Sequence, residues 1–259
     1  MTIASQSTDR GGEILPGSGA PLVSLRDIRL TFGSHQALRG VDLDIRPGEC
    51  LALLGDNAAG KSTLSKVISG TYIPDSGTIT VEGEEVRFTG PNDARSRHIE
   101  MVFQDLALCD HIDVVGNLFL GRELSKGPFL DQKAMLVRAQ EMLEALEIRI
   151  PRLTARVEKL SGGQRQAIAI ARAASFQPKV LIMDEPTSAL AVAEVEAVLA
   201  LINRVKAKGV GVVLITHRLQ DVFRVCDRIA VMYEGTKVAE RMIGDTDLEE
   251  VVKLITGGH

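Results

Sequence analysis

The sequence predicts an α/β fold in which helices cover a largely parallel β-sheet. Strand-sized apolar runs such as VLIM and VGVVLI alternate with helical segments after Pro178. A glycine-rich loop, GDNAAGKST, stands between a strand and a helix, as at the phosphate sites of such folds. We therefore expect a sheet-based core from residues 21–90 and 178–259, interrupted by a helical subdomain from residues 91–177.

Composition excludes several classes of protein. The chain has 259 residues, 45% of them apolar, which is enough to bury a sizeable core. A net charge of −4, 3% aromatic residues and no Trp argue against a nucleic-acid surface, which needs basic residues or a stacking platform. No apolar run approaches the roughly 20 residues that span a bilayer.

The chain start and the cysteines point to a cytoplasmic protein. Residues 1–20 lack the order of a signal peptide and are rich in Ser, Gly and Pro, so we interpret them as a flexible tail. Cys50, Cys109 and Cys226 have no metal-type spacing and fit a reducing compartment. We interpret them as core or surface thiols.

The first third of the chain predicts mixed β structure around one strand–loop–helix unit. Residues 22–32 alternate between apolar and polar, and VDLDI and ECLALLG follow after turns at His35 and Pro47. The segment KSTLSKVISG has helical spacing that Gly70 ends, and SGTITVEGEEVRF returns to strand character with a turn at Gly83.

The middle of the chain is predicted to be helical, and strands alternate with helices after Pro178. In DQKAMLVRAQEMLEALEI a set of apolar residues repeats at helical intervals, and we interpret it as a core-facing stripe: Met135, Ala139, Met142, Leu143 and Leu146. After Pro178 come the strand KVLIMD, a helix over VAEVEAVLALINRVKAKG, the strand VGVVLITH, and the strands DRIAVMY and VAERM.

The glycine-rich loop carries the strongest chemical signal. The pattern G-x-x-x-x-G-K-[ST] is met by Gly55, Asp56, Asn57, Ala58, Ala59, Gly60, Lys61 and Ser62. Lys61 is expected on the β- and γ-phosphates and the Ser62 hydroxyl on Mg²⁺, with Thr63 nearby. The alternative, an ordinary glycine turn, is disfavoured because a strand precedes the loop and a helix follows it.

Polar residues also follow other strands. Asp184 and Glu185 end the apolar run VLIM, so we expect Asp184 to orient the Mg²⁺ shell and Glu185 to hold an attacking water; the alternative is a solvated turn. His217 closes VVLITH, where an imidazole could reach a γ-phosphate, and Gln104 follows the strand-like run IEMVF. Each of these two residues is weak evidence for a binding site when taken by itself. We interpret the other histidines as surface residues: His35, His98, His111 and His259.

A second element resembles a phosphate site. In EKLSGGQRQ, Ser161 and Gln164 have the spacing of a capping box, so a well-capped helix without a ligand is one interpretation. Gly162 and Gly163, however, each cost up to about 1 kcal/mol of helix propensity relative to Ala. We therefore favour a backbone that something approaches closely. One nucleotide does not obviously need both this turn and the glycine-rich loop.

Taken in order from about Leu22, the P-loop, Gln104, LSGGQ, MDEP, SAL and His217 resemble the ATP-binding cassette family of ATPases. The resemblance implies a P-loop NTPase core of the RecA type, an antiparallel β subdomain and an inserted helical subdomain. It also implies ATP and Mg²⁺ as ligands. Finally, it implies that two copies face head to tail, so that the turn from Ser161 through Gly162 and Gly163 to Gln164 caps the γ-phosphate held by the other copy.

The resemblance assigns further roles. Phe32 resembles the aromatic that stacks on adenine, although a strand-end core Phe is the alternative. Gln104 resembles a residue that ligates Mg²⁺ and senses the membrane partner, and His217 resembles the residue that holds the γ-phosphate and the attacking water. Residues 110–123 lie where family members meet the coupling helix of a membrane subunit.

Two positions depart from the family pattern. Ala58 stands where many members have Gly, which the loop tolerates if Ala58 keeps an ordinary φ. Ala191 stands where SALD would supply an Asp that couples the two sites of a dimer, so we expect looser coordination between them.

The stretches GDNAAGKSTL and IEMVFQDLALCDHIDVVGNLFLGREL resemble monosaccharide importers of ribose, xylose or fructose type. We therefore expect a homodimeric ATPase at the cytoplasmic face of the bacterial inner membrane that drives a permease and depends indirectly on a periplasmic sugar-binding protein. The alternative is a non-transport cassette that acts on DNA ends or ribosomes. The resemblance implies a long inserted coiled coil for the first kind and a second cassette for the other, and we find neither pattern in the sequence. ATP binding without hydrolysis is disfavoured because Lys61, Asp184, Glu185 and His217 are all present.

Overall fold

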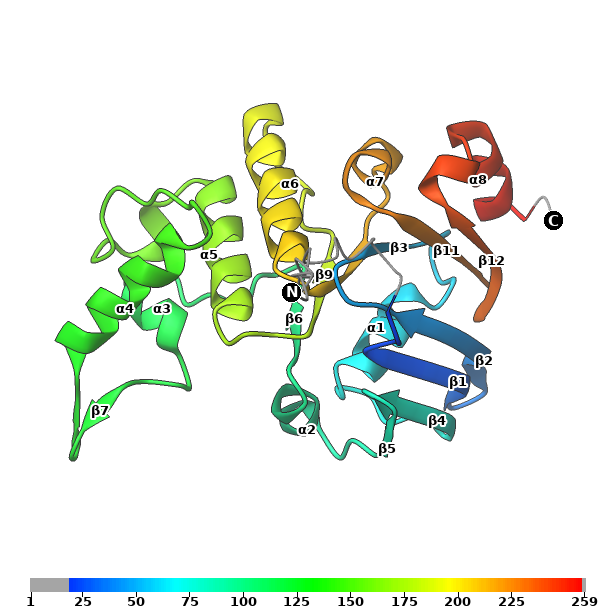
Figure 1. The fold of residues 1–259 in the computed structure, drawn as a ribbon, viewed down its shortest axis with the longest axis horizontal. Helices are drawn as coiled ribbons and strands as arrows, with labels where there is room; N and C mark the ends of the chain where they lie inside the picture. The colour runs from blue at the N-terminus through cyan, green and yellow to red at the C-terminus, as the bar shows by residue number, and fades with distance from the viewer. Residues whose placement is uncertain (1–18, 258–259) are drawn as a thin grey trace, which may run out of the picture.

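The computed structural model describes residues 19–257, coloured along the chain in Figure 1. Residues 1–18 of the tail predicted at 1–20 lie outside the described residues. The described chain forms a six-stranded sheet, a four-stranded sheet and a two-stranded hairpin, with helices around them. The α/β class predicted from the sequence is confirmed.

The six-stranded sheet is the centre of the fold. Its strands lie in the order β12 (Thr236–Met242), β11 (Arg228–Tyr233), β3 (Cys50–Gly55), β10 (Gly211–Ile215), β9 (Val180–Asp184), β6 (Ile99–Val102). All neighbours pair in parallel except β12, which runs antiparallel to β11. The middle strands β3, β10 and β9 are buried almost throughout, which explains why their sequences read as continuous apolar runs.

Strand β6 lies within residues 91–177, which the sequence assigns to the helical subdomain. It pairs with β9 over four residue pairs, from Ile99 with Val180 to Val102 with Met183. The six-stranded sheet therefore extends past the boundary predicted at residue 91.

The four-stranded sheet is antiparallel, in the order β2 (His35–Ile45), β1 (Val23–Phe32), β4 (Ser76–Val81), β5 (Glu84–Val86). Helix α1 (Lys61–Ile68) packs between this sheet and the six-stranded one, because its Leu64, Val67 and Ile68 share one apolar core with residues of both. The antiparallel subdomain expected from the family resemblance is thus present.

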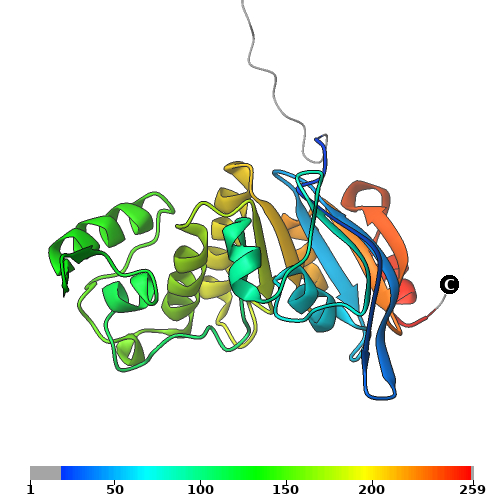
Figure 2. The same cartoon turned by 90° about the horizontal axis from the view of Figure 1, so that it is seen from below.

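Helices cover the other side of the six-stranded sheet, and some of them reach beyond one end of it. One apolar core runs from the sheet through α6 (Val192–Ala207) and α5 (Gly162–Ala174) to α3 (Val114–Phe119) and α4 (Gln132–Glu144). The five predicted core residues from Met135 to Leu146 are all buried in it. In Figures 1 and 2, α3, α4 and the hairpin β7 (Ser125–Lys126) with β8 (Phe129–Leu130) lie at the end remote from the four-stranded sheet.

Short helices complete the fold: α2 (Pro91–Ser96) before β6, α7 (Leu219–Val225) before β11, and α8 (Leu248–Ile255) after β12. Two 3₁₀ turns span Val157–Lys159 and Ile243–Asp245. Among residues 19–257, no helix has the length and apolar character needed to cross a bilayer.

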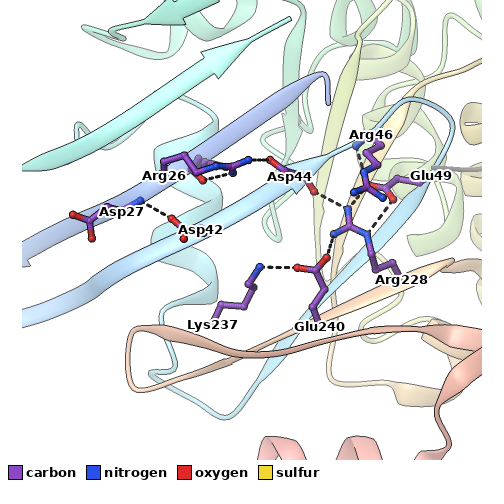
Figure 3. A network of polar contacts seen from close by, with 10 residues as sticks. Arg26, Asp27, Asp42, Asp44, Arg46, Glu49, Arg228, Lys237 and Glu240 are labelled. Carbon is purple, nitrogen blue, oxygen red and sulfur yellow. Dashed lines mark hydrogen bonds and ion pairs between the residues drawn. The ribbon is translucent and has the colours of Figure 1, made fainter. Parts of the chain in front are cut away.

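A buried arginine joins the two large sheets (Figure 3). The Arg228 side chain on β11 is 3% exposed, and its guanidinium pairs with the carboxylates of Glu49 and Glu240. It also donates a hydrogen bond to the backbone oxygen of Asp44 near the end of β2. Glu49 in turn accepts a hydrogen bond from the backbone N–H of Arg46. One cation thus fastens β11 and β12 to the connection between β2 and β3.

Two of the three cysteines meet in the core. The sulfur atoms of Cys50 and Cys226 lie 3.4 Å apart, and both residues are buried, whereas Cys109 is exposed. Burial raises the pKa of the Cys226 thiol well above its usual value. The interpretation as core or surface thiols is confirmed, although no sequence pattern indicated that two of them are neighbours.

We expect Arg228→Met to lower the free energy of unfolding by roughly 3–5 kcal/mol, because it leaves the buried Glu49 carboxylate without its counter-charge. Adding Glu49→Gln should recover much of that loss. The control Arg26→Met breaks a half-exposed pair with Asp44 and should cost at most about 1 kcal/mol. Urea unfolding measures all of them, and a single Arg228→Met variant as stable as the control would contradict the expectation.

We also expect a thiol reagent to modify one cysteine of the native protein, Cys109, and all three after unfolding in denaturant, since protonated buried thiols react poorly. Mass spectrometry of the modified peptides measures this. Rapid labelling of Cys50 or Cys226 in the native state would show that this part of the core opens easily.

Candidate functional site

Four adjacent parallel strands bring the predicted site residues to one edge of the six-stranded sheet. Asp184 ends β9 and Glu185 follows it; His217 comes two residues after β10; the P-loop follows β3; and Gln104 comes two residues after β6. Because the carboxyl ends of parallel strands meet at the same edge, residues far apart in the sequence become neighbours there. Ile215, for example, is level with both Asp184 on β9 and Leu53 on β3.

The P-loop has the predicted strand–loop–helix setting, and two of its positions require glycine. Gly55 has φ +146°, and an added Cβ would lie 2.2 Å from the backbone oxygen of Met232. Gly60 has φ +100° at the start of α1, and its Cβ would lie 2.9 Å from the backbone oxygen of Ala37. The loop is therefore held close to neighbouring backbone, with the N-terminus of α1 open toward it.

Lys61 folds back over the P-loop. Its ammonium group donates hydrogen bonds to the backbone oxygens of Gly55 at 2.8 Å and Asp56 at 2.9 Å. Burial lowers the pKa of Lys61, an effect that the nearby carboxylates of Glu185, Asp56 and Asp184 oppose. The loop thus presents one cation and the start of a helix, the combination that binds a phosphate group.

Ala58 adopts φ +64°, in the left-handed region. The sequence expectation was that the loop tolerates Ala here if its φ is ordinary, and this condition is not met. A Cβ in the left-handed region costs roughly 1–2 kcal/mol, so the residue that replaces the family's glycine is strained.

Glu185 is held in an unusual backbone conformation. Its φ is +52°, and its N–H donates to the backbone oxygen of Ile215 at 2.8 Å, which ties it to the neighbouring strand. Non-glycine residues in this region cluster at functional sites, where the surrounding structure fixes them. The Ser188 hydroxyl donates to the backbone oxygen of Glu185 and closes the turn.

The side chains of Glu185 and His217 face each other. Oε2 of Glu185 is buried and accepts no hydrogen bond, and Nδ1 of His217 lies 2.9 Å from it. The contact is therefore an ion pair only when the imidazole is protonated. The Glu185 side chain is 16% exposed and that of His217 is 74% exposed. A mostly buried carboxylate therefore lies beside a solvent-exposed imidazole.

Asp184 has a different setting from Glu185. Burial raises the pKa of Asp184, the Glu185 carboxylate raises it further, and the ammonium groups of Lys66 and Lys61 lower it. The edge thus holds two carboxylates in unlike surroundings beside the cation of Lys61.

A cavity of about 310 Å³ joins the P-loop to the four-stranded sheet, and it is lined by Phe32, His35, Ala37 and residues 57–63. Phe32 is 46% exposed and makes an edge-to-face contact with Tyr72, with ring centroids 5.2 Å apart, so it is not a core residue. His35, which the sequence placed among surface histidines, also lines this cavity. Its pairing opposite Phe32 across the β1–β2 turn explains its position, and only the hairpin register could have revealed it.

The turn from Ser161 to Gln164 forms the predicted capping box. The Ser161 hydroxyl accepts a hydrogen bond from the Gln164 N–H at 3.2 Å, and the Gln164 side chain accepts one from the Ser161 N–H at 3.0 Å. No residue of this turn lines the P-loop cavity. Figures 1 and 2 show α5 on the helical side of the molecule, with α1 on the other.

Gly163 is in close contact with Glu194 of the same chain. An added Cβ would lie 2.8 Å from the Glu194 side chain, and the Gly163 N–H donates to Glu194 Oε1 at 3.0 Å. The close approach inferred from the sequence therefore exists, but at Gly163 the approaching group is a side chain of this protein.

The oxygen donors at the sheet edge fit a magnesium ion. Ser62 offers a hydroxyl, Asp184 a carboxylate and Gln104 an amide oxygen, and residues 19–257 contain no cluster of three His, Cys, Asp or Glu side chains that could hold a metal. Mg²⁺ prefers oxygen ligands and is usually held by one or two protein groups together with substrate phosphates and water, rather than by a protein cage.

Comparisons with known proteins agree with this geometry. A family model described as ABC transporter matches residues 38–188. The xylose/arabinose import ATP-binding protein of Sulfolobus acidocaldarius is 46% identical over 91% of this chain and 94% of the relative. The fructose import ATP-binding protein of Rhizobium meliloti is 42% identical over 92% and 94%. The ribose import ATP-binding protein of Bacillus licheniformis is 43% identical, but the match covers 48% of it, so this chain spans about half its length.

Solved structures show the same fold. A nucleotide-free ATP-binding cassette from an ABC transporter has a TM-score of 0.79 and 27% identity, over 92% of this chain and 96% of that one. A dimeric cassette in a post-hydrolysis state, bound to ADP and Pi, has a TM-score of 0.73 and 25% identity, over 85% and 98%. Neither these structures nor these relatives support the alternative of a cassette that acts on DNA ends or ribosomes.

We expect Ala58→Gly to raise the melting temperature by about 2–4 °C, because glycine removes the left-handed strain at the P-loop, although its freer unfolded chain offsets part of the gain. The control is Ala193→Gly, in the first turn of α6, which should lower stability. Calorimetry measures both. A melting temperature for Ala58→Gly below that of the parent would contradict the strain assigned to Ala58.

Proposed function

Because this chain belongs to the ABC transporter family, we propose that it is the ATP-hydrolysing subunit of an importer and that a monosaccharide is the cargo. The observation that carries the proposal is the meeting of the P-loop, Asp184, Glu185 and His217 at the ends of three adjacent strands. The cargo class rests on the relatives, whose names specify xylose or arabinose, fructose and ribose import.

The residues of the edge divide the work on ATP. The P-loop N–H groups and Lys61 hold the phosphates, and the exposed ring of Phe32 supports the adenine from the other end of the same cavity. Ser62, Asp184 and Gln104 would hold Mg²⁺, which when bound would supply positive charge to the phosphates. Glu185 accepts the proton of the attacking water, and the imidazole of His217 orients that water and the γ-phosphate.

The turn from Ser161 to Gln164 serves a second copy of the chain. It begins a helix and can offer N–H groups to an anion, yet it lies away from its own P-loop cavity. Two copies that face head to tail give each P-loop the turn of the other, so each complete site is built from two chains. A solved relative of the same fold is a dimer with ADP and Pi bound.

The membrane permease docks beside residues 110–123. A cavity of about 240 Å³ lies there between β6, the end of α3 and α5, and its basic residues are Arg95, Arg122 and Arg172. Arg172 donates hydrogen bonds to the backbone oxygens of Leu106 and Ala107, in the loop that carries Gln104. A partner in this cavity would therefore press on the loop that reaches the Mg²⁺ site.

We propose that the protein lies at the cytoplasmic face of the bacterial inner membrane, where the permease holds it. A periplasmic sugar-binding protein supplies the sugar from the other side.

We expect Glu185→Gln to lower the ATPase kcat at least about 100-fold, because it removes the base that takes the proton from water. ATP affinity should stay within about twofold, since Lys61 and the P-loop are unchanged, and the variant should accumulate as an ATP-bound dimer. Steady-state ATPase assays and sedimentation with ATP measure the two effects. The control Glu196→Gln changes an exposed glutamate that pairs with Arg224 and should be indistinguishable from the parent.

Normal turnover by Glu185→Gln would remove Glu185 from the mechanism.

For the cargo, a host strain lacking this chain should lose uptake of one monosaccharide, which the parent restores and Glu185→Gln does not. Unimpaired uptake of all pentoses and hexoses in that strain would contradict sugar import.

A further inference from the structure

The turn that starts α5 already binds a carboxylate of its own chain. Glu194 comes from the first turn of α6, and its Oε1 accepts the hydrogen bond from the Gly163 N–H. The Ser161 side chain lies close enough to help lower the pKa of the Glu194 carboxylate. Its other oxygen, Oε2, accepts a hydrogen bond from the N–H of Ala191 at 3.2 Å. An internal anion thus occupies donors at the N-terminus of α5.

These donors are the ones that the proposed function gives to the γ-phosphate of the partner's ATP. An N–H group makes one strong hydrogen bond, and two anions at hydrogen-bond distance from the same donor repel each other. The Gly163 N–H therefore cannot serve Glu194 and a phosphate at the same time. The absence of a Cβ at Gly163 brings Glu194 close enough to compete, since its side-chain carbons would lie 2.8–2.9 Å from that atom.

We propose that Glu194 is a positioning residue that holds the turn from Ser161 to Gln164 in the single chain and that the partner's γ-phosphate must displace its carboxylate when two copies close. This inference rests on the proposed function and adds a residue that sets the strength of the ATP-driven dimer. The hydrogen bonds from Gly163 and Ala191, together with the nearby Ser161 side chain, also hold the pKa of Glu194 below its usual value, so the competing group is charged at neutral pH.

The displaced carboxylate has a place to go without unfolding anything. It keeps the N–H of Ala191 within reach at the start of α6, where a negative charge interacts favourably with the helix dipole. Glu194 is also partly exposed, so water can solvate the freed oxygen. Release is then a side-chain rotation that leaves the backbone of both helices in place.

Ala191 connects the Glu194 carboxylate to the segment that carries Glu185. It stands six residues after Glu185 at the N-cap of α6, and its side chain makes no capping hydrogen bond. Glu194 thus contacts both the turn that serves the partner's nucleotide and the segment that leads back to this chain's own catalytic glutamate. In a chain without the Asp that the family resemblance expects at position 191, Glu194 supplies a carboxylate at that junction.

The test uses the Glu185→Gln protein, which hydrolyses ATP too slowly to disturb an equilibrium. Into it we would place Glu194→Gln, which keeps the shape of the side chain, or Glu194→Ala, which removes it. Sedimentation equilibrium with saturating ATP and Mg²⁺ gives the dimer dissociation constant. Titration with a fluorescent ATP analogue at a protein concentration where the chain is monomeric gives the nucleotide affinity.

Both variants should dimerise roughly tenfold more tightly than the Glu185→Gln parent, because a charge-assisted hydrogen bond no longer has to be broken at either site. Nucleotide affinity of the monomer should not change, since the P-loop cavity does not include Glu194. The matched control is Glu196→Gln in the same background. It changes a glutamate of the same helix that pairs with Arg224 instead, and its dimer constant should equal that of the parent.

A dimer constant that is unchanged or weaker in both Glu194 variants would overturn the inference, because the carboxylate would then be neutral or a permanent support of the turn. Tightening by Glu196→Gln to the same extent would overturn it too, since the effect would be one of net charge. A Glu185→Gln parent that stays monomeric with ATP would instead overturn the proposed dimer itself, and the inference with it.

Discussion

The parallel pairing of β3, β10, β9 and β6 is the constraint on which the site depends. It puts the P-loop, His217, the pair Asp184–Glu185 and Gln104 on one sheet edge. Along the chain, more than 160 residues separate Gly55 of the P-loop from His217. The pairing is fixed because the middle strands are buried on both faces, so that a slip of register would disturb packed apolar side chains throughout the core.

The sequence revealed those parts of the site that rest on local patterns. The P-loop, the capping box at Ser161 and the acidic pair after VLIM each need only a few neighbouring residues, so spacing predicted where they lie. His35 was missed because its position depends on the register of the β1–β2 hairpin. Glu194 was missed because it reaches Gly163 across 31 residues, and no pattern marks that contact.

Tertiary contacts also decided the other differences. The run IEMVF was interpreted as a strand that leads into the helical segment, but a four-residue strand carries too little pattern to reveal that β6 pairs with β9 in the six-stranded sheet. The left-handed conformation of Ala58 follows from the shape of the loop between β3 and α1 and not from alanine's own preference. Strain at Ala58 and at Glu185 therefore lies where the fold imposes geometry on the site, while the core beneath is apolar and well packed.

The Arg228 network has a consequence for how a nucleotide enters. Phe32 belongs to one sheet and the P-loop to the other, and the guanidinium locks these two sheets through Glu49, Glu240 and the backbone of Asp44. In the proposed site, the base and the triphosphate would therefore meet two walls that this network already joins in the single chain. Less of the binding free energy would then be needed to order the two walls, and more of it would be available for the proposed dimerisation.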